Sequence, residues 1–276
     1  MKYAFNTASA PHLSLAELLE AARQYGYDGL EIRSGAGHAH GIETTADAER
    51  RAELRYEAEE AGVALTALGI SSRFTTAEDQ EDQITAAAQA ILLARDMGIP
   101  YVRLFCGRLV PGSAWDESLS RVLVALERLA PIAADEGVML LLETHDDWSA
   151  PHVLADLLRR ANHPSLGVLW DVLHTQHEGR ALPGEVVRML GPWIKHVHVH
   201  DGVAGSRANG HPDYRAIGSG DIRHAEVIRS LRAIGFTGYL SGEWFQWEPY
   251  DIHLPREREA LRLAEPLSKE GEADGF

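Results

Sequence analysis

Residues 137–147 read GVMLLLETHDD, and this stretch holds the unit that decides the fold. A short apolar run begins after Gly137 and ends abruptly at Glu143, where a polar loop follows. Helical patterns flank the stretch at about 116–135 and 151–161, and a glycine directly after a helix is typical of the C′ position. The order of helix, glycine, buried strand, polar loop and helix is that of a parallel α/β sheet.

The same unit recurs along the whole chain. The predicted strands begin near Tyr3, Gly29, Ala64, Tyr101, Val138, Leu166, Ile194 and Gly238. Helical segments are expected at about 14–25, 45–61, 77–97, 116–135, 151–161, 183–190, 222–234 and 255–265. This alternation predicts an α/β fold, a closed (β/α)8 TIM barrel formed as a single domain by residues 1–265, with a polar tail at 266–276. An open doubly wound sheet is the alternative, but no G-x-G-x-x-G motif follows the first strand.

Composition narrows the class of protein. The 276-residue chain has a formal net charge of −15 and no Lys/Arg cluster, which argues against nucleic-acid and anionic-membrane partners. Its single cysteine, Cys106, excludes an internal disulfide and a thiolate zinc cluster, and it suits a reducing compartment. The N-terminal MKYAFNTASA lacks an apolar h-region, and no apolar run approaches the roughly 20 residues that cross a bilayer. We expect a cytoplasmic protein, and the sequence leaves open whether it forms a homo-oligomer.

The barrel fixes where chemistry is expected, because the active sites of such barrels lie at the C-terminal ends of the strands. Four successive predicted strands end in groups that suit a divalent cation. These groups are Glu143, Asp171 with His174, the segment KHVHVHD at 195–201, and Glu243. A carboxylate directly after three leucines is costly to bury without a compensating charge. The set therefore predicts a metal site at the mouth of the barrel.

Strand geometry limits what the three histidines of KHVHVHD can do. His196, His198 and His200 share one face of their strand, which we expect to be the barrel interior. Two residues advance a strand by about 6.6 Å, so His196 and His200 are roughly 13 Å apart and cannot easily share one ion. We expect His196 to be a hydrogen-bonded interior group.

The pattern Glu143…Asp171-x-x-His174…His198-x-x-Asp201…Glu243 resembles that of the xylose isomerase-like barrels, in particular the sugar phosphate isomerase/epimerase group. That group includes ketose 3-epimerases and inosose dehydratases. The segments GYDGLEIR (26–33), GHAHG (37–41) and SGEW (241–244) are similar to it as well, so the resemblance covers nearly the whole chain. It implies that the metal ligands are Glu143, Asp171, His198 and Glu243. Relatives often carry Lys where this chain has His200, which leaves the substrate open.

Three carboxylates and one imidazole form a hard, oxygen-rich set that suits Mn²⁺, with Mg²⁺, Co²⁺ or Zn²⁺ as alternatives. A sugar that chelates such an ion through a carbonyl and the adjacent hydroxyl becomes acidic at the α carbon. We therefore expect a metal-dependent sugar isomerase or epimerase that works through an enediolate on a ketose, inosose or related sugar. Glu143 and Glu243 are the expected proton-transfer groups, each with one oxygen on the metal and one free. The alternative is a dehydratase or lyase that acts on keto sugars by the same enolisation.

Further polar residues near the strand ends are candidate substrate contacts. His174 is expected to act in catalysis and, with His145, to orient or polarise sugar oxygens. Arg33 either holds a substrate anion or pairs with Glu31, and pairing is favoured. The remaining substrate-binding candidates are His38, His40, Arg215, Trp244 and His200, and His200 could instead lie at the lip of the barrel or behind the metal ligands. The absence of a lysine near the GSG segment at 218–220 favours an unphosphorylated sugar or a cyclitol.

Two other functions compete with this interpretation. A DNA endonuclease of the same superfamily would need extra His or Glu ligands on the early strands and a basic groove. The early strand ends of this chain offer Asn6, Glu31 and Arg103 instead. A non-enzymatic sugar-binding barrel is opposed by the paired glutamates Glu143 and Glu243.

Overall fold

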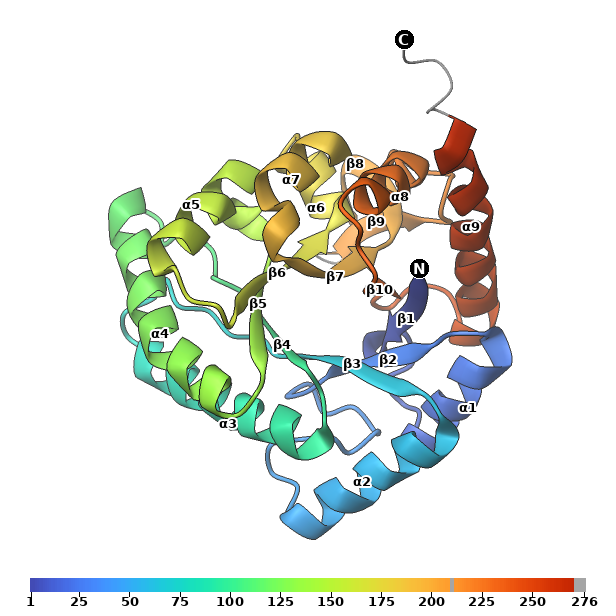
Figure 1. Cartoon of the computed structure of the whole chain (residues 1–276), viewed down its shortest axis with the longest axis horizontal. Coiled ribbons are helices and arrows are strands. Elements are labelled where there is room, and N and C mark those ends of the chain that lie inside the picture. The colour runs from blue at the N-terminus through green and yellow to red at the C-terminus, as the bar shows by residue number, and fades with distance from the viewer. Residues whose placement is uncertain (209–210, 271–276) are drawn as a thin grey trace.

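The computed structural model describes residues 1–208 and 211–270. Parallel strands gather at the centre in the closed order β1-β10-β7-β6-β5-β4-β3-β2, and helices surround them (Figure 1). The strands are β1 (Lys2–Asn6), β2 (Gly29–Arg33), β3 (Ala64–Gly69), β4 (Tyr101–Leu104), β5 (Met139–Glu143), β6 (Leu166–Asp171), β7 (Ile194–Val199) and β10 (Tyr239–Gly242). The predicted (β/α)8 barrel is confirmed, and each predicted strand start lies within 1 residue of the observed one.

The helices begin and end where local chemistry favours it. They are α1 (Leu15–Tyr25), α2 (Ala48–Ala61), α3 (Gln80–Met97), α4 (Trp115–Asp135), α5 (Pro151–Ala161), α6 (Val172–His177), α7 (Pro183–Leu190), α8 (His224–Ala233) and α9 (Tyr250–Glu270). A capping box formed by Ser14 and Glu17 starts α1, and Gly26 ends it in the left-handed conformation at φ 75°. The last helix extends beyond the expected 255–265 and includes residues 266–270, while residues 271–276 of the predicted tail lie outside the described residues.

Two segments depart from a simple strand–helix alternation. The short helix α6 begins directly after β6, so two helices, α6 and α7, separate β6 from β7. After β7 the chain forms an antiparallel pair, β8 (Asp201–Ala208) and β9 (His211–Arg215), before it reaches α8. We expected a loop at 202–220. Its glycines and charged residues hide the alternation typical of strands, although the Asn-Gly dipeptide at 209–210 is a common hairpin signal in a sequence.

Asp201 holds together the base of the segment that contains β8 and β9. Its fully buried carboxylate accepts hydrogen bonds from the backbone N–H groups of Gly202 (2.9 Å), Gly218 (2.8 Å), Gly220 (3.1 Å) and Ile222 (3.1 Å). A Cβ atom at Gly220 would lie only 2.2 Å from Oδ1 of Asp201, so the close approach requires glycine. One side chain thereby holds the start and the end of the segment together.

The barrel interior at the C-terminal end of β7 is polar. His196 and His198 alternate along the strand with Val197 and Val199, and the valines join the apolar core. In the register of the sheet, His198 lies opposite Asp171 on β6 and opposite Ser241 on β10. None of the described helices has both the length and the apolar character that crossing a membrane requires.

Candidate metal centre and active site

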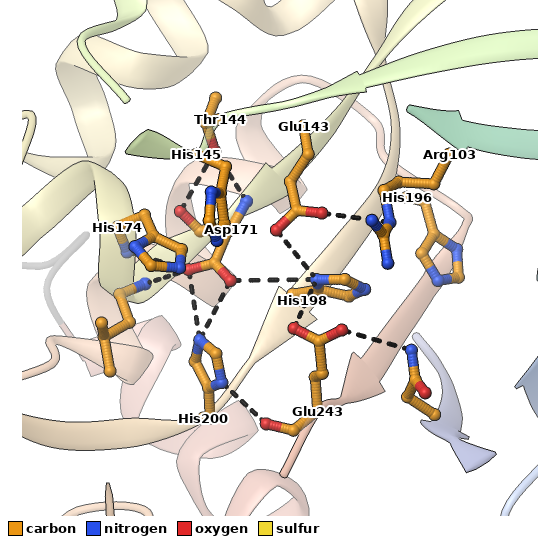
Figure 2. A network of polar contacts seen from close by, with 12 residues as sticks. Arg103, Glu143, Thr144, His145, Asp171, His174, His196, His198, His200 and Glu243 are labelled. Atoms are coloured by element: carbon orange, nitrogen blue, oxygen red, sulfur yellow. Dashed lines mark hydrogen bonds and ion pairs between the residues drawn. The ribbon is translucent and has the colours of Figure 1, made fainter. Parts of the chain in front are cut away.

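Four side chains meet at the C-terminal ends of four neighbouring strands (Figure 2). Glu143 ends β5, Asp171 ends β6, His198 lies near the end of β7 and Glu243 directly follows β10. Each of the four offers a ligand atom, and these atoms all lie within 4.8 Å of one another. The structure therefore brings together the four residues that the sequence indicated.

His198 stands at the centre of three carboxylates. Its Nδ1 lies 3.3 Å from Glu243 Oε2, 3.6 Å from Glu143 Oε1 and 3.8 Å from Asp171 Oδ2. Both oxygens of Glu143, Oδ2 of Asp171 and Nδ1 of His198 are buried without a hydrogen-bond partner among the described residues. Three buried carboxylates around one imidazole repel each other unless a cation joins them. The donor set thus fits a divalent metal ion.

A second layer fixes the orientation of His198. Glu31 lies with its Oε1 and Oε2 at 2.8 Å and 3.0 Å from His198 Nε2, and its Oε2 is also 2.9 Å from His196 Nε2. A carboxylate at Nε2 keeps a ring proton on that nitrogen, so Nδ1, which faces the three acidic side chains, is the nitrogen that would bind a metal ion. His196 is the interior hydrogen-bonded group that we expected.

The two glutamates of the centre have different neighbours. Glu143 Oε2 is 3.2 Å from Nε of the fully buried Arg103, whose Nη1 also donates to the carbonyl of Ile70 at 3.0 Å. Glu243 Oε1 instead accepts a hydrogen bond from the amide of Asn6 at 3.3 Å, and the same amide donates to Glu31 at 3.0 Å. Thus a cation holds one glutamate, whereas a neutral amide holds the other.

These neighbours give Glu143 and Glu243 different pKa values. Burial raises the pKa of Glu143, but Arg103 and then His198 outweigh burial and hold that pKa at about 2. Burial also raises the pKa of Glu243, where His198 opposes it and the Glu143 charge adds to it, and the net shift is upward. Burial lowers the pKa of His198, but the charges of Glu243, Glu31 and Glu143 hold it well above its usual value. The site therefore contains one firmly ionised glutamate and one more basic glutamate.

Asp171 is held from two directions. Its Oδ1 accepts the backbone N–H groups of Leu173 and His174, both at 2.8 Å, and so caps helix α6. His200 Nε2 is hydrogen-bonded to Oδ1 at 3.2 Å and lies 3.0 Å from Oδ2, and His200 Nδ1 lies 2.8 Å from the carbonyl oxygen of Glu243. Both ring nitrogens of His200 are thus engaged by Asp171 and Glu243. His200 thus lies behind the proposed ligands and positions these two groups, which is one of the roles that the sequence left open for it, and neither ring nitrogen is free for a substrate contact.

The sequence of the chain matches a known protein family. A model of the family described as "Xylose isomerase-like TIM barrel" matches residues 19–266. The chain belongs to this family. The family and the barrel were both predicted from the sequence, and the site lies at the end of the barrel where such enzymes carry their chemistry.

Two curated relatives match only part of the chain. An uncharacterised protein of Methanocaldococcus jannaschii is 30% identical over 142 residues, which are 47% of this chain and 46% of that protein. A protein of Mus musculus named as a candidate hydroxypyruvate isomerase is 27% identical over 168 residues, 56% of this chain and 57% of its own length. The matches thus span about half the length of these relatives.

Solved structures share the whole fold at low identity. A D-psicose 3-epimerase has a TM-score of 0.78 at 17% identity and covers 97% of this chain and 99% of its own. A probable 3-DHS dehydratase from Bacillus anthracis has a TM-score of 0.80 at 22% identity, with 95% and 99% covered. The 3-keto-D-glucoside 4-epimerase of E. coli has a TM-score of 0.76 at 16% identity, with 96% and 99% covered. These similarities establish the fold.

His145 and His174 form a second group beside the centre of this xylose isomerase-like barrel. Their ring centroids are 4.2 Å apart, and each offers a ligand atom within 4.8 Å of one offered by Glu143. His145 Nδ1 lies 2.9 Å from Asp146 Oδ2, and His174 Nδ1 lies 3.4 Å from Glu178 Oε2. The two imidazoles are therefore placed to contact the oxygens of a molecule bound at Glu143.

The expected pairing of Arg33 with Glu31 is wrong, because two histidines occupy Glu31. The Arg33 guanidinium instead donates to Ser71, its Nη1 is buried without a hydrogen bond among the described residues, and burial lowers the pKa of Arg33 to about 10.

The expectation that His40 contacts the substrate is also wrong. His40 is buried, its Nε2 contacts the carbonyl of Arg33 at 3.1 Å and its Nδ1 accepts from Ile42 N at 3.0 Å, so it anchors the loop.

The other expected substrate contacts lie in separate surroundings. His38 is 3.4 Å from the Thr7 hydroxyl, and burial together with His40 lowers its pKa to about 4. Arg215, on β9, forms a two-point ion pair with Asp213 at 2.6 Å and 2.7 Å. Trp244 is buried and stacks on Trp247 with centroids 6.3 Å apart. None of these three joins the Glu143 cluster.

Asn6, Glu31 and Arg103 belong to the candidate site in the structure, but the sequence analysis did not assign them to it. They lie on β1, β2 and β4, and all three are fully buried. A polar residue late in a predicted barrel strand is the only signal for them in the sequence. That signal is the same one that identified Glu143, but no spaced motif accompanied it.

Proposed function

We propose that this chain is a metal-dependent sugar isomerase or epimerase that moves a proton next to the carbonyl of a ketose, inosose or related unphosphorylated sugar. The observation that carries the proposal is the pair Glu143 and Glu243, which share one ligand set but have a cationic and a neutral partner. Glu143, Asp171, His198 and Glu243 would hold the ion, for which Mn²⁺ is our expectation. When bound, such an ion polarises a sugar carbonyl and makes the neighbouring C–H acidic.

Each side chain of the site would have a separate role in the proposed reaction. Glu243 takes the proton from the sugar at Oε1, the oxygen that faces the Asn6 amide. Glu143 stays ionised, because a proton on it would weaken the pair with the buried Arg103. His174 and His145 orient the sugar oxygens beside Glu143. If Glu243 returns the proton to the neighbouring carbon, the product is an isomer. An epimer forms if a protonated His145 or His174, beside the ionised Glu143, delivers a proton to the same carbon from the opposite face and is protonated again by solvent.

A dehydratase or lyase that acts on keto sugars is the second candidate. The His145–His174 pair supports it, because an imidazole beside the enolised carbon can protonate a departing β-hydroxyl. A probable dehydratase is also among the solved structures of similar fold. The nature of the product separates this candidate from the first one.

One experiment tests the proposal. The Mn²⁺-loaded protein is incubated in D₂O with a panel of ketoses, inososes and 3-keto sugars, and each sugar is recovered and examined by NMR and mass spectrometry. We expect deuterium at a carbon next to the carbonyl of at least one sugar, because enolisation exchanges that proton with solvent. The product identifies isomerisation, epimerisation or dehydration. A fully loaded protein that incorporates no deuterium from any sugar would refute the proposal.

Glu31→Gln is expected to weaken Mn²⁺ binding by roughly 10–100-fold, the usual effect of losing a carboxylate behind a metal-binding histidine. Glutamine can turn its NH₂ group toward His198 Nε2, which moves the imidazole proton to Nδ1 and blocks the lone pair that faces the three carboxylates. Isothermal titration calorimetry and the EPR signal of free Mn²⁺ measure the dissociation constant independently of catalysis.

Glu257→Gln is the matched control for this variant. Glu257 is also fully buried, but it accepts the backbone N–H of Ile217 at 2.7 Å and lies outside the metal centre. It should leave the Mn²⁺ affinity unchanged. Equal dissociation constants for Glu31→Gln and the wild type, in proteins that are equally folded by circular dichroism, would show that Glu31 does not orient His198.

A further inference from the structure

A cavity of about 530 Å³ opens beside the candidate active site. The loops that follow β3, β4 and β5 line it, and they contribute residues between Ser71 and Asp79, between Phe105 and Pro111, and at 145–146. His145 belongs both to this cavity and to the cluster with Glu143 and His174. The volume falls within the range of about 300–1,000 Å³ that is typical of small-molecule sites. The cavity is therefore an extension of the site beyond His145.

Hydrogen bonds between the three loops hold the walls in place. Thr75 Oγ1 donates to the carbonyl of Arg108 at 2.6 Å, and the Leu109 N–H donates to Asp147 Oδ2 at 2.8 Å. Trp148 Nε1 donates to the carbonyl of Gly107 at 2.7 Å. Gly107 has φ 100°, and a Cβ atom there would come within 2.8 Å of Arg73 Cβ, so the close approach of the loops requires glycine. A ligand would enter a cavity that is already formed.

The charges in the cavity are balanced. Arg73 pairs with Asp79 at 3.3 Å, and Arg108 pairs with Asp146 at 2.8 Å. A phosphate or carboxylate in this cavity would compete with an acidic partner for each arginine. The ion pairs and the hydroxyls of Ser71, Ser72 and Thr76 instead offer donors and acceptors to a neutral group.

Phe105 gives the cavity an aromatic wall next to the metal centre. Its ring centroid lies 4.6 Å from that of His145, and the Arg103 guanidinium lies 4.0 Å from the Phe105 centroid. Arg103 in turn pairs with Glu143, so Phe105 and His145 separate the cavity from the proposed reaction centre by one layer of side chains. A sugar ring matches such a lining, because it has hydroxyls at its edge and a C–H face that packs on an aromatic ring.

We propose that this cavity is a subsite for a second sugar ring, so that the substrate is a glycoside whose keto ring reacts at the Glu143–Glu243 centre. The inference rests on the proposed function for the reacting ring. A single monosaccharide at the centre would leave the cavity unused. A neutral second ring would satisfy the hydroxyls and ion pairs that line it.

Two keto sugars with the same reacting ring test the subsite. One is a 3-keto disaccharide, and the other is the corresponding methyl 3-keto glycoside. With the Mn²⁺-loaded protein, we expect kcat/KM for deuterium incorporation to be at least about tenfold higher for the disaccharide. Thr76→Trp narrows the cavity and should lower this ratio about tenfold, whereas Thr76→Ser keeps the hydroxyl and should preserve it. A ratio near one in the wild type would overturn the subsite.

Binding without turnover separates the subsite from the reaction. An unoxidised disaccharide is titrated into the Mn²⁺-loaded wild type and Thr76→Trp, and saturation-transfer NMR reports contact. Binding that Thr76→Trp removes supports the subsite, even if no keto sugar exchanges deuterium and the proposed function fails. If single-ring keto sugars exchange deuterium but the disaccharide neither binds nor reacts better than they do, the subsite is wrong and the proposed function stands.

Discussion

Glu243→Gln is expected to lower deuterium incorporation into the substrate by at least about 10³-fold, within the range that a positioned general base contributes. Glutamine keeps the size of the side chain and an oxygen for Asn6, but it cannot accept the proton. The rate is measured by NMR in D₂O at a Mn²⁺ concentration that saturates the variant. Saturation is needed because Glu243 is also one of the four proposed ligands.

Two further variants are compared with Glu243→Gln. Glu257→Gln, a buried substitution outside the centre, should retain the wild-type exchange rate. Glu143→Gln should weaken Mn²⁺ binding, because it removes the carboxylate between Arg103 and His198. If the metal-saturated Glu243→Gln protein exchanged deuterium within about tenfold of the wild type, Glu243 could not be the base.

Among the variants described, Asp201→Ala is expected to lower the free energy of unfolding most, by about 3–5 kcal/mol. The substitution removes the acceptor of four backbone N–H groups at the base of the β8–β9 excursion. Two of these donors, the N–H groups of Gly202 and Ile222, are buried and would lose their partner, and the segment between β7 and α8 loosens. In a protein of this length we expect the melting temperature to fall by roughly 10 °C.

Asp156→Ala is the control for that measurement. Asp156 lies on α5 in an exposed pair with Arg160, and its loss should change the free energy of unfolding by no more than about 0.5 kcal/mol. Differential scanning calorimetry and urea unfolding of both variants give the comparison. Asp201→Ala with the melting temperature of Asp156→Ala would contradict the assigned structural role.

The barrel could be predicted from the sequence because its unit is local and repeated. Each strand is a short apolar run, and glycines such as Gly26 and Gly137 follow helices where the backbone adopts positive φ. The β8–β9 pair was missed for the opposite reason. Its residues show no apolar alternation, and what fixes the segment is a set of bonds from Asp201 to residues as far away as Ile222.

The same distinction applies to the site. Because strand ends in a barrel converge, a site at these four strands could be predicted, and the family resemblance then implied Glu143, Asp171, His198 and Glu243 as the ligands. The sequence did not indicate that Glu31 would contact histidines 165 and 167 positions away, or that Arg103 would approach Glu143. These contacts depend on the closure of the barrel, which places β1, β2 and β4 around the same interior. The asymmetry between the two glutamates follows from such contacts and could not be read from a motif.

The hydrogen bonds to Asp201 also distinguish the base of β8 and β9 from the part of these strands that lies farther along the chain. The bonds from Asp201 to Gly218, Gly220 and Ile222 hold the base of β8 and β9 before the chain enters α8, and Tyr214 of β9 is buried near this base, 5.6 Å from His200 between ring centroids. Insertions are best tolerated where few buried backbone bonds are disturbed. The part of β8 and β9 that lies farther from Asp201 is therefore a natural grafting position, where a longer hairpin or a foreign loop could be installed next to the mouth of the barrel while the barrel itself is preserved.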